Sequence, residues 1–134
     1  MKGMFRSSNK YHSRKITRDG MTFDSLKEYR KFRELSLLEK AGEISDLQRQ
    51  VEFELIPAQY EEVPTGEVYK RGERQGQPKM KRVCVEKSVK YIADFVYKEN
   101  GKTIVMDTKG VRTKDYILKR KMLLYLNNIK IKEV

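Results

Sequence analysis

Cross-linking and metal-binding side chains are scarce in this chain of 134 residues. Cys84 is its only cysteine, which excludes a framework of disulfides and a zinc site built on cysteines. His12 is its only histidine, which excludes a metal cluster built on histidines. No apolar run approaches the length of a membrane span, and the first residues lack the apolar core of a signal peptide. We therefore expect a reduced, cytoplasmic protein without a membrane partner.

Positive charge, in contrast, is abundant and unevenly spread. Thirty Lys and Arg residues against nineteen Asp and Glu residues give a net charge of +11 and a pI of about 9.7. Residues 1–18 contain six basic residues and no acidic one, and residues 19–69 carry a net charge of −6. The net charge is +6 over residues 70–90 and +5 over residues 112–134. Basic segments around a more acidic middle favour a polyanionic partner such as DNA. The simpler alternative is a basic protein that is merely soluble.

Caps, turns and apolar spacing predict a helix, three strands, a second helix and a last strand. Asp24 or Ser25 begins the first helix, and Gly42 ends it. Asn100-Gly101 predicts an antiparallel hairpin. The expected elements are a helix from about 24 to 41, strands over 48–56, around Asp94 and around Asp107, a helix over about 114–126, and a strand over 129–134. This order predicts an α/β (α+β) fold with a mixed central sheet flanked by helices.

The ends and the middle of the chain differ in character. Residues 1–20 are expected to form a basic N-terminal arm, and residues 21–134 a single domain. That domain contains an insertion at about 57–88, which holds all three prolines and much of the charge. The insertion is either a long loop or a hairpin with strands at Glu67–Lys70 and Arg82–Glu86.

Two neighbouring strands carry acidic residues in apolar surroundings. Asp94 lies within Tyr91–Tyr97, and Asp107 ends an apolar run and is followed by Thr108 and Lys109. Because strand side chains alternate, Asp107 and Lys109 should point the same way, with Thr108 opposite. Pairing of the two strands would bring Asp94 beside them. Two carboxylates and an ammonium group suit a hard divalent cation and a water nucleophile that cut a phosphodiester. The alternative for Asp94 is a salt bridge to a lysine.

Each member of this patch has an expected role. Asp94 and Asp107 would hold Mg²⁺ or Mn²⁺ with help from the backbone carbonyl of Thr108. Lys109 would orient the attacking water or stabilise the charge on the phosphate.

Glu28 is the third candidate carboxylate. It shares a helix face with Phe32 and Leu35, where a carboxylate needs a cation, a metal or a hydrogen-bond donor. It would bind the metal through water or help to hold a second metal. The alternative is a capping box, in which Glu28 returns to the backbone N–H of Ser25.

Several basic side chains are expected to contact DNA. Lys121 is placed on an inward stripe with Leu118, Met122 and Tyr125, from which it could touch a phosphate. The alternative is a long side chain that passes the core to reach solvent. The expected nucleic-acid contacts are Lys10, Arg14, Lys15, Arg112, Lys114, Lys119 and Lys121.

Glu28 on a leading helix, Asp94 on a strand and Asp107-x-Lys109 on the next strand resemble the PD-(D/E)XK nuclease superfamily. Within it, the chain is similar to small phage and prophage nuclease-like domains over about residues 9–134. The segments that carry this similarity are Gly20–Glu28, Leu37–Ile44 and Phe53–Pro57. One departure is Ala93, which stands where the superfamily name leads one to expect proline.

The resemblance implies a restriction-endonuclease-like core, with Glu28, Asp94, Asp107 and Lys109 as catalytic residues. It also implies Mg²⁺-dependent cleavage of DNA, as in Holliday-junction resolvases and transposon-end nucleases of the superfamily. In a phage setting this activity would serve recombination, replication or DNA processing in the host cytoplasm. Branched DNA would be the preferred substrate, with duplex DNA as the other candidate, and a homodimer would cut two strands together. Two alternatives remain: a basic accessory protein that binds DNA without cutting it, and a nuclease that acts on RNA.

Overall fold

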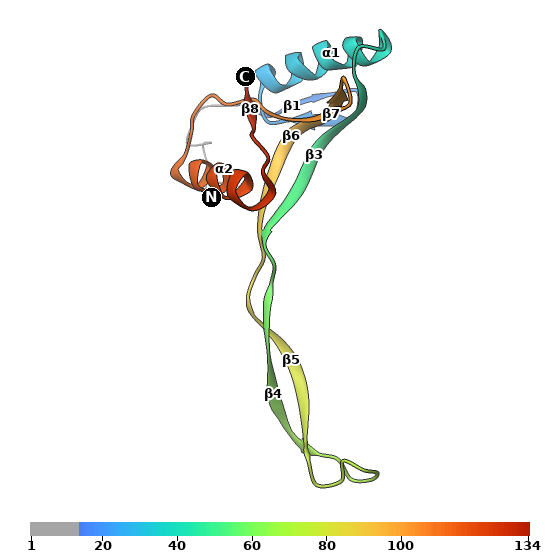
Figure 1. The fold of residues 1–134 in the computed structure, drawn as a ribbon, viewed down its shortest axis with the longest axis vertical. Coiled ribbons are helices and arrows are strands. Elements are labelled where there is room, and N and C mark those ends of the chain that lie inside the picture. Colours follow the sequence, from blue (N-terminus) through green and yellow to red (C-terminus); the bar gives the residue numbers. More distant parts are fainter. Residues whose placement is uncertain (1–13) are drawn as a thin grey trace, which may run out of the picture.

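The computed structural model describes residues 14–134, which form an α+β body and a long two-stranded arm (Figure 1). Lys10 and most of the expected basic segment 1–20 therefore lie outside the described residues. Within the described part of the chain, no helix is long and apolar enough to cross a membrane.

The body is built on a mixed four-stranded sheet with the strand order β3-β6-β7-β8. Strands β3, β6 and β7 pair antiparallel, and β8 pairs parallel to β7. The helices α1 and α2 flank this sheet, so the expected fold class is confirmed (Figure 1). The elements are β1 Ile16–Arg18, β2 Met21–Phe23, α1 Leu26–Lys40, β3 Ser45–Ile56, β4 Gln59–Val68, β5 Pro78–Glu86, β6 Val89–Glu99, β7 Lys102–Asp107, α2 Lys114–Asn127 and β8 Lys132–Glu133.

Helix α1 begins and ends where its capping residues predict. The Oγ of Ser25 accepts a hydrogen bond from the backbone N–H of Glu28 at 3.1 Å, which satisfies one of the free donors of the first turn. Ala41 is the C-cap, and Gly42 follows with a φ of +78°, a conformation that glycine adopts without steric cost. The cap at Ser25 fixes the first turn of α1, and this turn carries Glu28.

The hairpin between β6 and β7 is also the one that the sequence predicts. Asn100 and Gly101 both have positive φ, at 51° and 75°, as a two-residue hairpin turn of this kind requires. Glu99 pairs with Lys102, and the register continues to Phe95 and Met106. This pairing brings the middle of β6, with Asp94, next to the end of β7.

Two clusters of buried side chains attach the helices to the sheet. The cluster on the α2 side contains Leu55, Tyr91, Ala93, Val105, Tyr116, Leu123 and Ile131. The cluster on the α1 side contains Leu35, Ile44, Phe95, Tyr97 and Met106. In β6 the buried residues alternate regularly, which is the pattern of a central strand.

The buried face of α2 differs from the predicted stripe. Tyr116 and Leu123 are buried, whereas Leu118 is 58% exposed and Tyr125 is 89% exposed. The expected inward stripe that joined Leu118 and Tyr125 to Lys121 is therefore wrong. Apolar residues occur around the whole circumference of this helix, so periodicity alone does not select its buried face.

The insertion at 57–88 forms a hairpin, whose strands β4 and β5 are longer than the predicted segments 67–70 and 82–86. β3 leads directly into β4, and β5 leads directly into β6, so the hairpin extends the β3–β6 ribbon away from the body (Figure 1). A second, unpredicted hairpin consists of β1 and β2, and it occupies part of the segment assigned to the basic N-terminal arm.

Candidate active site

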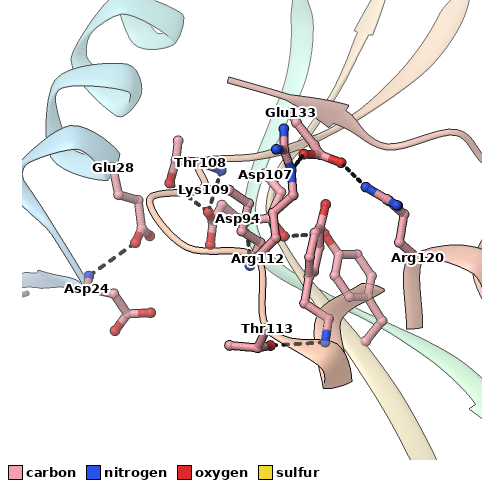
Figure 2. A network of polar contacts seen from close by, with 12 residues as sticks. Asp24, Glu28, Asp94, Asp107, Thr108, Lys109, Arg112, Thr113, Arg120 and Glu133 are labelled. Atoms are coloured by element: carbon pink, nitrogen blue, oxygen red, sulfur yellow. Dashed lines mark hydrogen bonds and ion pairs between the residues drawn. The ribbon is translucent and has the colours of Figure 1, made fainter. Parts of the chain in front are cut away.

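The four residues of the expected quartet lie together at one place in the body (Figure 2). Glu28 comes from the first turn of α1, Asp94 from β6, Asp107 from the end of β7, and Lys109 from the loop that follows. A pocket of about 300 Å³ opens here. Its lining residues are Asp24, Ser25, Lys27, Glu28, Asp94, Thr108, Lys109, Gly110 and Val111.

Asp94 is held by the residue that follows β7. Its Oδ2 accepts hydrogen bonds from the backbone N–H and from the hydroxyl of Thr108, each at 2.8 Å. Its Oδ1 has only a long contact of 3.5 Å, with the side-chain amide of Gln50. The alternative of a salt bridge between Asp94 and a lysine is not found in residues 14–134.

Thr108 therefore differs from its expected orientation. Its side chain was expected to point away from Asp94, but it donates a hydrogen bond to that carboxylate. The physical reason is that β7 ends at Asp107, so the alternation of strand side chains does not continue through Thr108.

Asp107 lies behind the pocket, with a side chain only 1% exposed. Its Oδ2 accepts a hydrogen bond from the hydroxyl of Tyr91. Its Oδ1 receives no hydrogen bond, although it lies 3.2 Å from the Nζ of Lys109. Burial, reinforced by Asp94, raises the pKa of Asp107 to about 7. The burial of Tyr91 and its hydrogen bond to Asp107 raise the pKa of the Tyr91 hydroxyl far above its usual range.

Lys109 faces both the acidic pair and the α2 core. Its Nζ lies 4.1 Å from the centroid of the Tyr116 ring, as well as 3.2 Å from Asp107. Its backbone carbonyl accepts a hydrogen bond from the Nζ of Lys27 at 3.2 Å. The ammonium group of Lys109 is thus held beside the carboxylates by two kinds of contact.

Glu28 combines the two roles that the sequence leaves open. Its Oε2 accepts a hydrogen bond from the backbone N–H of Asp24 at 3.1 Å, one residue earlier than a standard capping box requires. Its Oε1 accepts a hydrogen bond of 3.0 Å from the side-chain amide of Gln50. Burial first, and then the neighbouring Asp94 carboxylate, raise the pKa of Glu28 to about 7.

Gln50 and Arg49 belong to the site but were not predicted. The amide of Gln50 contacts both Glu28 and Asp94, and its φ of +52° is unusual for a residue within a strand. The guanidinium of Arg49 lies 4.0 Å from the centroid of the Phe23 ring and 3.9 Å from Glu28 Oε1. No sequence signal marks the conformation of Gln50. For Arg49, the only signal is a basic residue within an otherwise amphipathic strand.

The predicted DNA contacts among residues 14–134 differ in where they lie relative to the candidate active site. Arg14 and Lys15 line a neighbouring depression together with Lys27, so they lie next to the candidate active site. Lys114 is exposed at the start of α2.

The other predicted contacts are paired or remote. Arg112 forms an ion pair with Glu133, and Lys119 forms one with Asp115 at 3.3 Å. Lys121 lines a different pocket, none of whose residues lines the candidate active site. Its expected reach into the site is therefore wrong, because it lies on the exposed side of α2.

The donor set fits a hard cation that keeps some of its waters. Within residues 14–134, no three Asp, Glu, His or Cys side chains form a ready-made metal cage. Mg²⁺ typically uses one or two carboxylates and leaves other positions for water and substrate phosphate. Asp94 and Asp107 each keep one carboxylate oxygen without a close hydrogen bond, and Asp107 Oδ1 is buried. Asp94 lines the pocket, whereas a cation at Asp107 Oδ1 would compete with the ammonium group of Lys109, 3.2 Å away.

Comparison with protein families finds a match that spans residues 8–133. The matching family is described as "Protein of unknown function (DUF1064)". Comparison with curated proteins and with solved structures finds no match.

Proposed function

We propose that this chain, which belongs to the DUF1064 family, is a metal-dependent endonuclease that hydrolyses phosphodiester bonds in DNA. The observation that carries the proposal is the convergence of Glu28, Asp94 and Lys109 on one pocket, with Asp107 behind it in contact with Lys109. Each of the four side chains has its own hydrogen-bond or ion-pair partner. No single structural interaction explains why all four lie together.

The electrostatics of the site support a cation. Glu28 and Asp107 are almost fully buried, and the pKa of each is raised to about 7 by burial and by Asp94. Three carboxylates that repel one another at neutral pH are relieved by a proton or by a positive ion. A divalent cation at Asp94 and Asp107 would offset this repulsion more strongly than Lys109 does alone.

The chain's own residues have complementary tasks in this proposal. Asp94 and Asp107, with the carbonyl of Thr108, would hold Mg²⁺ or Mn²⁺. The bound ion would activate water as a nucleophile and offset the negative charge that develops on the phosphate. Lys109 would orient the water or contact the phosphate, and Thr108 keeps the Asp94 carboxylate oriented through two hydrogen bonds. Glu28 would act through water or at a second ion.

DNA is proposed as the substrate because of the charge around the pocket. The net charge of the chain is +11, and Arg14, Lys15 and Lys27 line the depression beside the site. Branched DNA as the preferred form, and a dimer that cuts two strands, rest on the resemblance to junction resolvases.

The proposal is tested by cleavage of a labelled four-way junction beside linear duplex and single-stranded DNA, in Mg²⁺ or Mn²⁺. Lys109→Ala should abolish cleavage, because Lys109 lies at the acidic pair. It should leave binding nearly intact and lower the salt slope by about one counterion. The matched control is Lys102→Ala, which removes the same charge from the exposed β6–β7 turn and should cut normally.

The outcomes separate the candidate functions. Paired symmetric nicks on the junction, lost in Lys109→Ala, would support a resolvase. Equal cutting of all DNAs would keep the nuclease and remove the preference for junctions. Binding without cutting in either metal would contradict the nuclease. It would favour a basic accessory protein, to which the net charge of +11 already points.

A further inference from the structure

The hairpin of β4 and β5 has no neighbour in the described structure. It projects from the body as a two-stranded ribbon, with its turn at the far end (Figure 1). Almost all of its residues are exposed, and no third strand or helix packs against it within residues 14–134. An isolated two-stranded ribbon is only marginally stable in water. An exposed arm of this length is therefore a candidate surface for binding a partner.

The far end of the arm is basic. We define the arm tip as residues 69–79, which contain four cationic residues and a single acidic one, Glu73. The cationic residues are Lys70, Arg71, Arg74 and Lys79. Within the described chain none of the four forms an ion pair. Arg74 and Lys79 lie 5.9 Å and 5.6 Å from the centroid of the Tyr69 ring, which keeps two cations at the tip.

Neither face of the ribbon offers a continuous apolar stripe to a protein partner. Residues directly opposite each other in an antiparallel pair share a face. On one face Val63 lies opposite Lys81, and on the other Glu62 lies opposite Arg82. Tyr60, the largest apolar side chain of β4, is covered by the guanidinium of Arg82 at 3.8 Å. Charged and apolar groups therefore alternate, which suits a polyanion better than a second copy of the chain.

The length of the arm matches a length of duplex. β4 has ten residues, which at about 3.3 Å per residue span roughly 33 Å. One helical turn of B-DNA rises by about 34 Å, and its major groove admits a two-stranded ribbon. Residues 78–94 connect the arm to Asp94 at the pocket, a path of up to roughly 50 Å at about 3.3 Å per residue. A tip that binds phosphate would therefore reach about one and a half turns away from the pocket.

We propose that the arm tip binds the phosphate backbone of duplex DNA about one and a half helical turns from the cleavage site, through Lys70, Arg71 and Arg74. This inference rests on the proposed function, because it places the DNA relative to the pocket of Glu28, Asp94 and Lys109. The arm then sets the length of double-stranded DNA that the enzyme requires on one side of the cleavage site, which we call the flank. A flank that is too short, or single-stranded, loses the contact.

The test compares two triple variants with the same change in net charge. The tip variant is Lys70→Ser, Arg71→Ser and Arg74→Ser. The control is Lys40→Ser, Lys98→Ser and Lys102→Ser, which removes three exposed cations near the end of α1 and the β6–β7 turn. Lys98 lies at the end of β6 opposite to the arm, so the control leaves the tip unchanged.

Binding is measured by fluorescence anisotropy in EDTA over a series of salt concentrations. The duplexes have roughly 10 bp and roughly 30 bp, which are about one and three helical turns. On the long duplex the tip variant should bind about tenfold more weakly, and its slope of log K against log salt should fall by about 2.7. The short duplex cannot span the pocket and the tip together, so on it the tip variant should lose less affinity than on the long duplex.

A second variant is expected to strengthen DNA binding, and a misfolded protein would not show this change. Glu73→Gln removes the single acidic side chain of the tip, so it should tighten binding to the long duplex. Equal salt slopes for the tip variant and the control would overturn the inference. The inference would also be overturned if the tip variant changed only the oligomeric state, as measured by sedimentation. If wild type cuts DNA while both tip changes have no effect, only the arm inference fails. If wild type neither binds nor cuts DNA, the proposed function fails with it.

Discussion

Replacing Glu28 by glutamine should stabilise the metal-free protein above neutral pH, although it removes a residue of the candidate active site. Glu28 is 2% exposed, and its pKa is raised from 4.5 to about 7, mainly by burial and then by Asp94. The folded state therefore binds this proton more tightly than the unfolded state does. The stability that protonated Glu28 provides is complete below pH 4.5 and is lost as the pH rises through about 7.

The size of the effect follows from the same two values. A rise from 4.5 to about 7 corresponds to about 3 kcal/mol of unfolding free energy, since one pKa unit is worth about 1.4 kcal/mol. Glutamine cannot accept from both Asp24 and Gln50 as the carboxylate does, and the lost hydrogen bond costs about 1 kcal/mol. We therefore expect Glu28→Gln to be more stable than wild type by about 1 to 2 kcal/mol above pH 8.

The assay is urea unfolding in EDTA at several pH values between 4 and 9, followed by circular dichroism. Wild type should lose stability as the pH rises, and the variant should lose less. Asp107, whose pKa is also about 7, keeps part of the dependence in both proteins. A variant that is less stable than wild type at high pH, with the same pH slope, would refute the assigned burial and repulsion of Glu28.

Two further predictions concern the cation and the strained strand. Mg²⁺ in the millimolar range should raise the thermal midpoint of wild type but not of Asp94→Asn, because a ligand of the folded state stabilises it by mass action; equal shifts in both proteins would place the ion elsewhere. Gln50→Gly relieves a positive φ and removes the amide that contacts Glu28 and Asp94. Its stability should therefore stay within about 1 kcal/mol of wild type, while the Mg²⁺ concentration for half-maximal cleavage shifts. An unchanged Mg²⁺ dependence would assign Gln50 to the fold alone.

Local chemistry accounts for what the sequence predicts well. Ser25, Gly42 and Asn100-Gly101 each specify a conformation of the backbone on their own, and the structure has α1 and the β6–β7 hairpin at those positions. The same chemistry could have revealed the unpredicted β1–β2 hairpin. Asp19 and Gly20 separate its strands and have φ values of 52° and 76°, so they resemble Asn100-Gly101 in type and conformation.

Tertiary contacts account for what the sequence does not predict. The buried face of α2 depends on the position of the sheet, and Leu118 and Leu123 are indistinguishable until that position is known. The side chain of Thr108 follows the end of β7 rather than its alternation. The role of Gln50 depends on a φ of +52° in the middle of a strand. A glutamine in the sequence does not predict this backbone conformation. For the candidate site, the sequence therefore indicates the acids and the lysine, but not the residues that hold them.

Under the proposed function, the residues that bind DNA are separate from the residues that catalyse its cleavage. A phosphate that approaches Glu28, Asp94 and Asp107 without a cation meets like charge in a buried site, so these residues oppose DNA binding by themselves. Affinity in the absence of metal must then come from cations outside the site, such as Arg14 and Lys15 beside it and the arm tip far from it. A divalent ion would reverse the repulsion only at the pocket. Under this proposal DNA is positioned by the outlying basic groups, and the buried carboxylates become productive only when the metal is present.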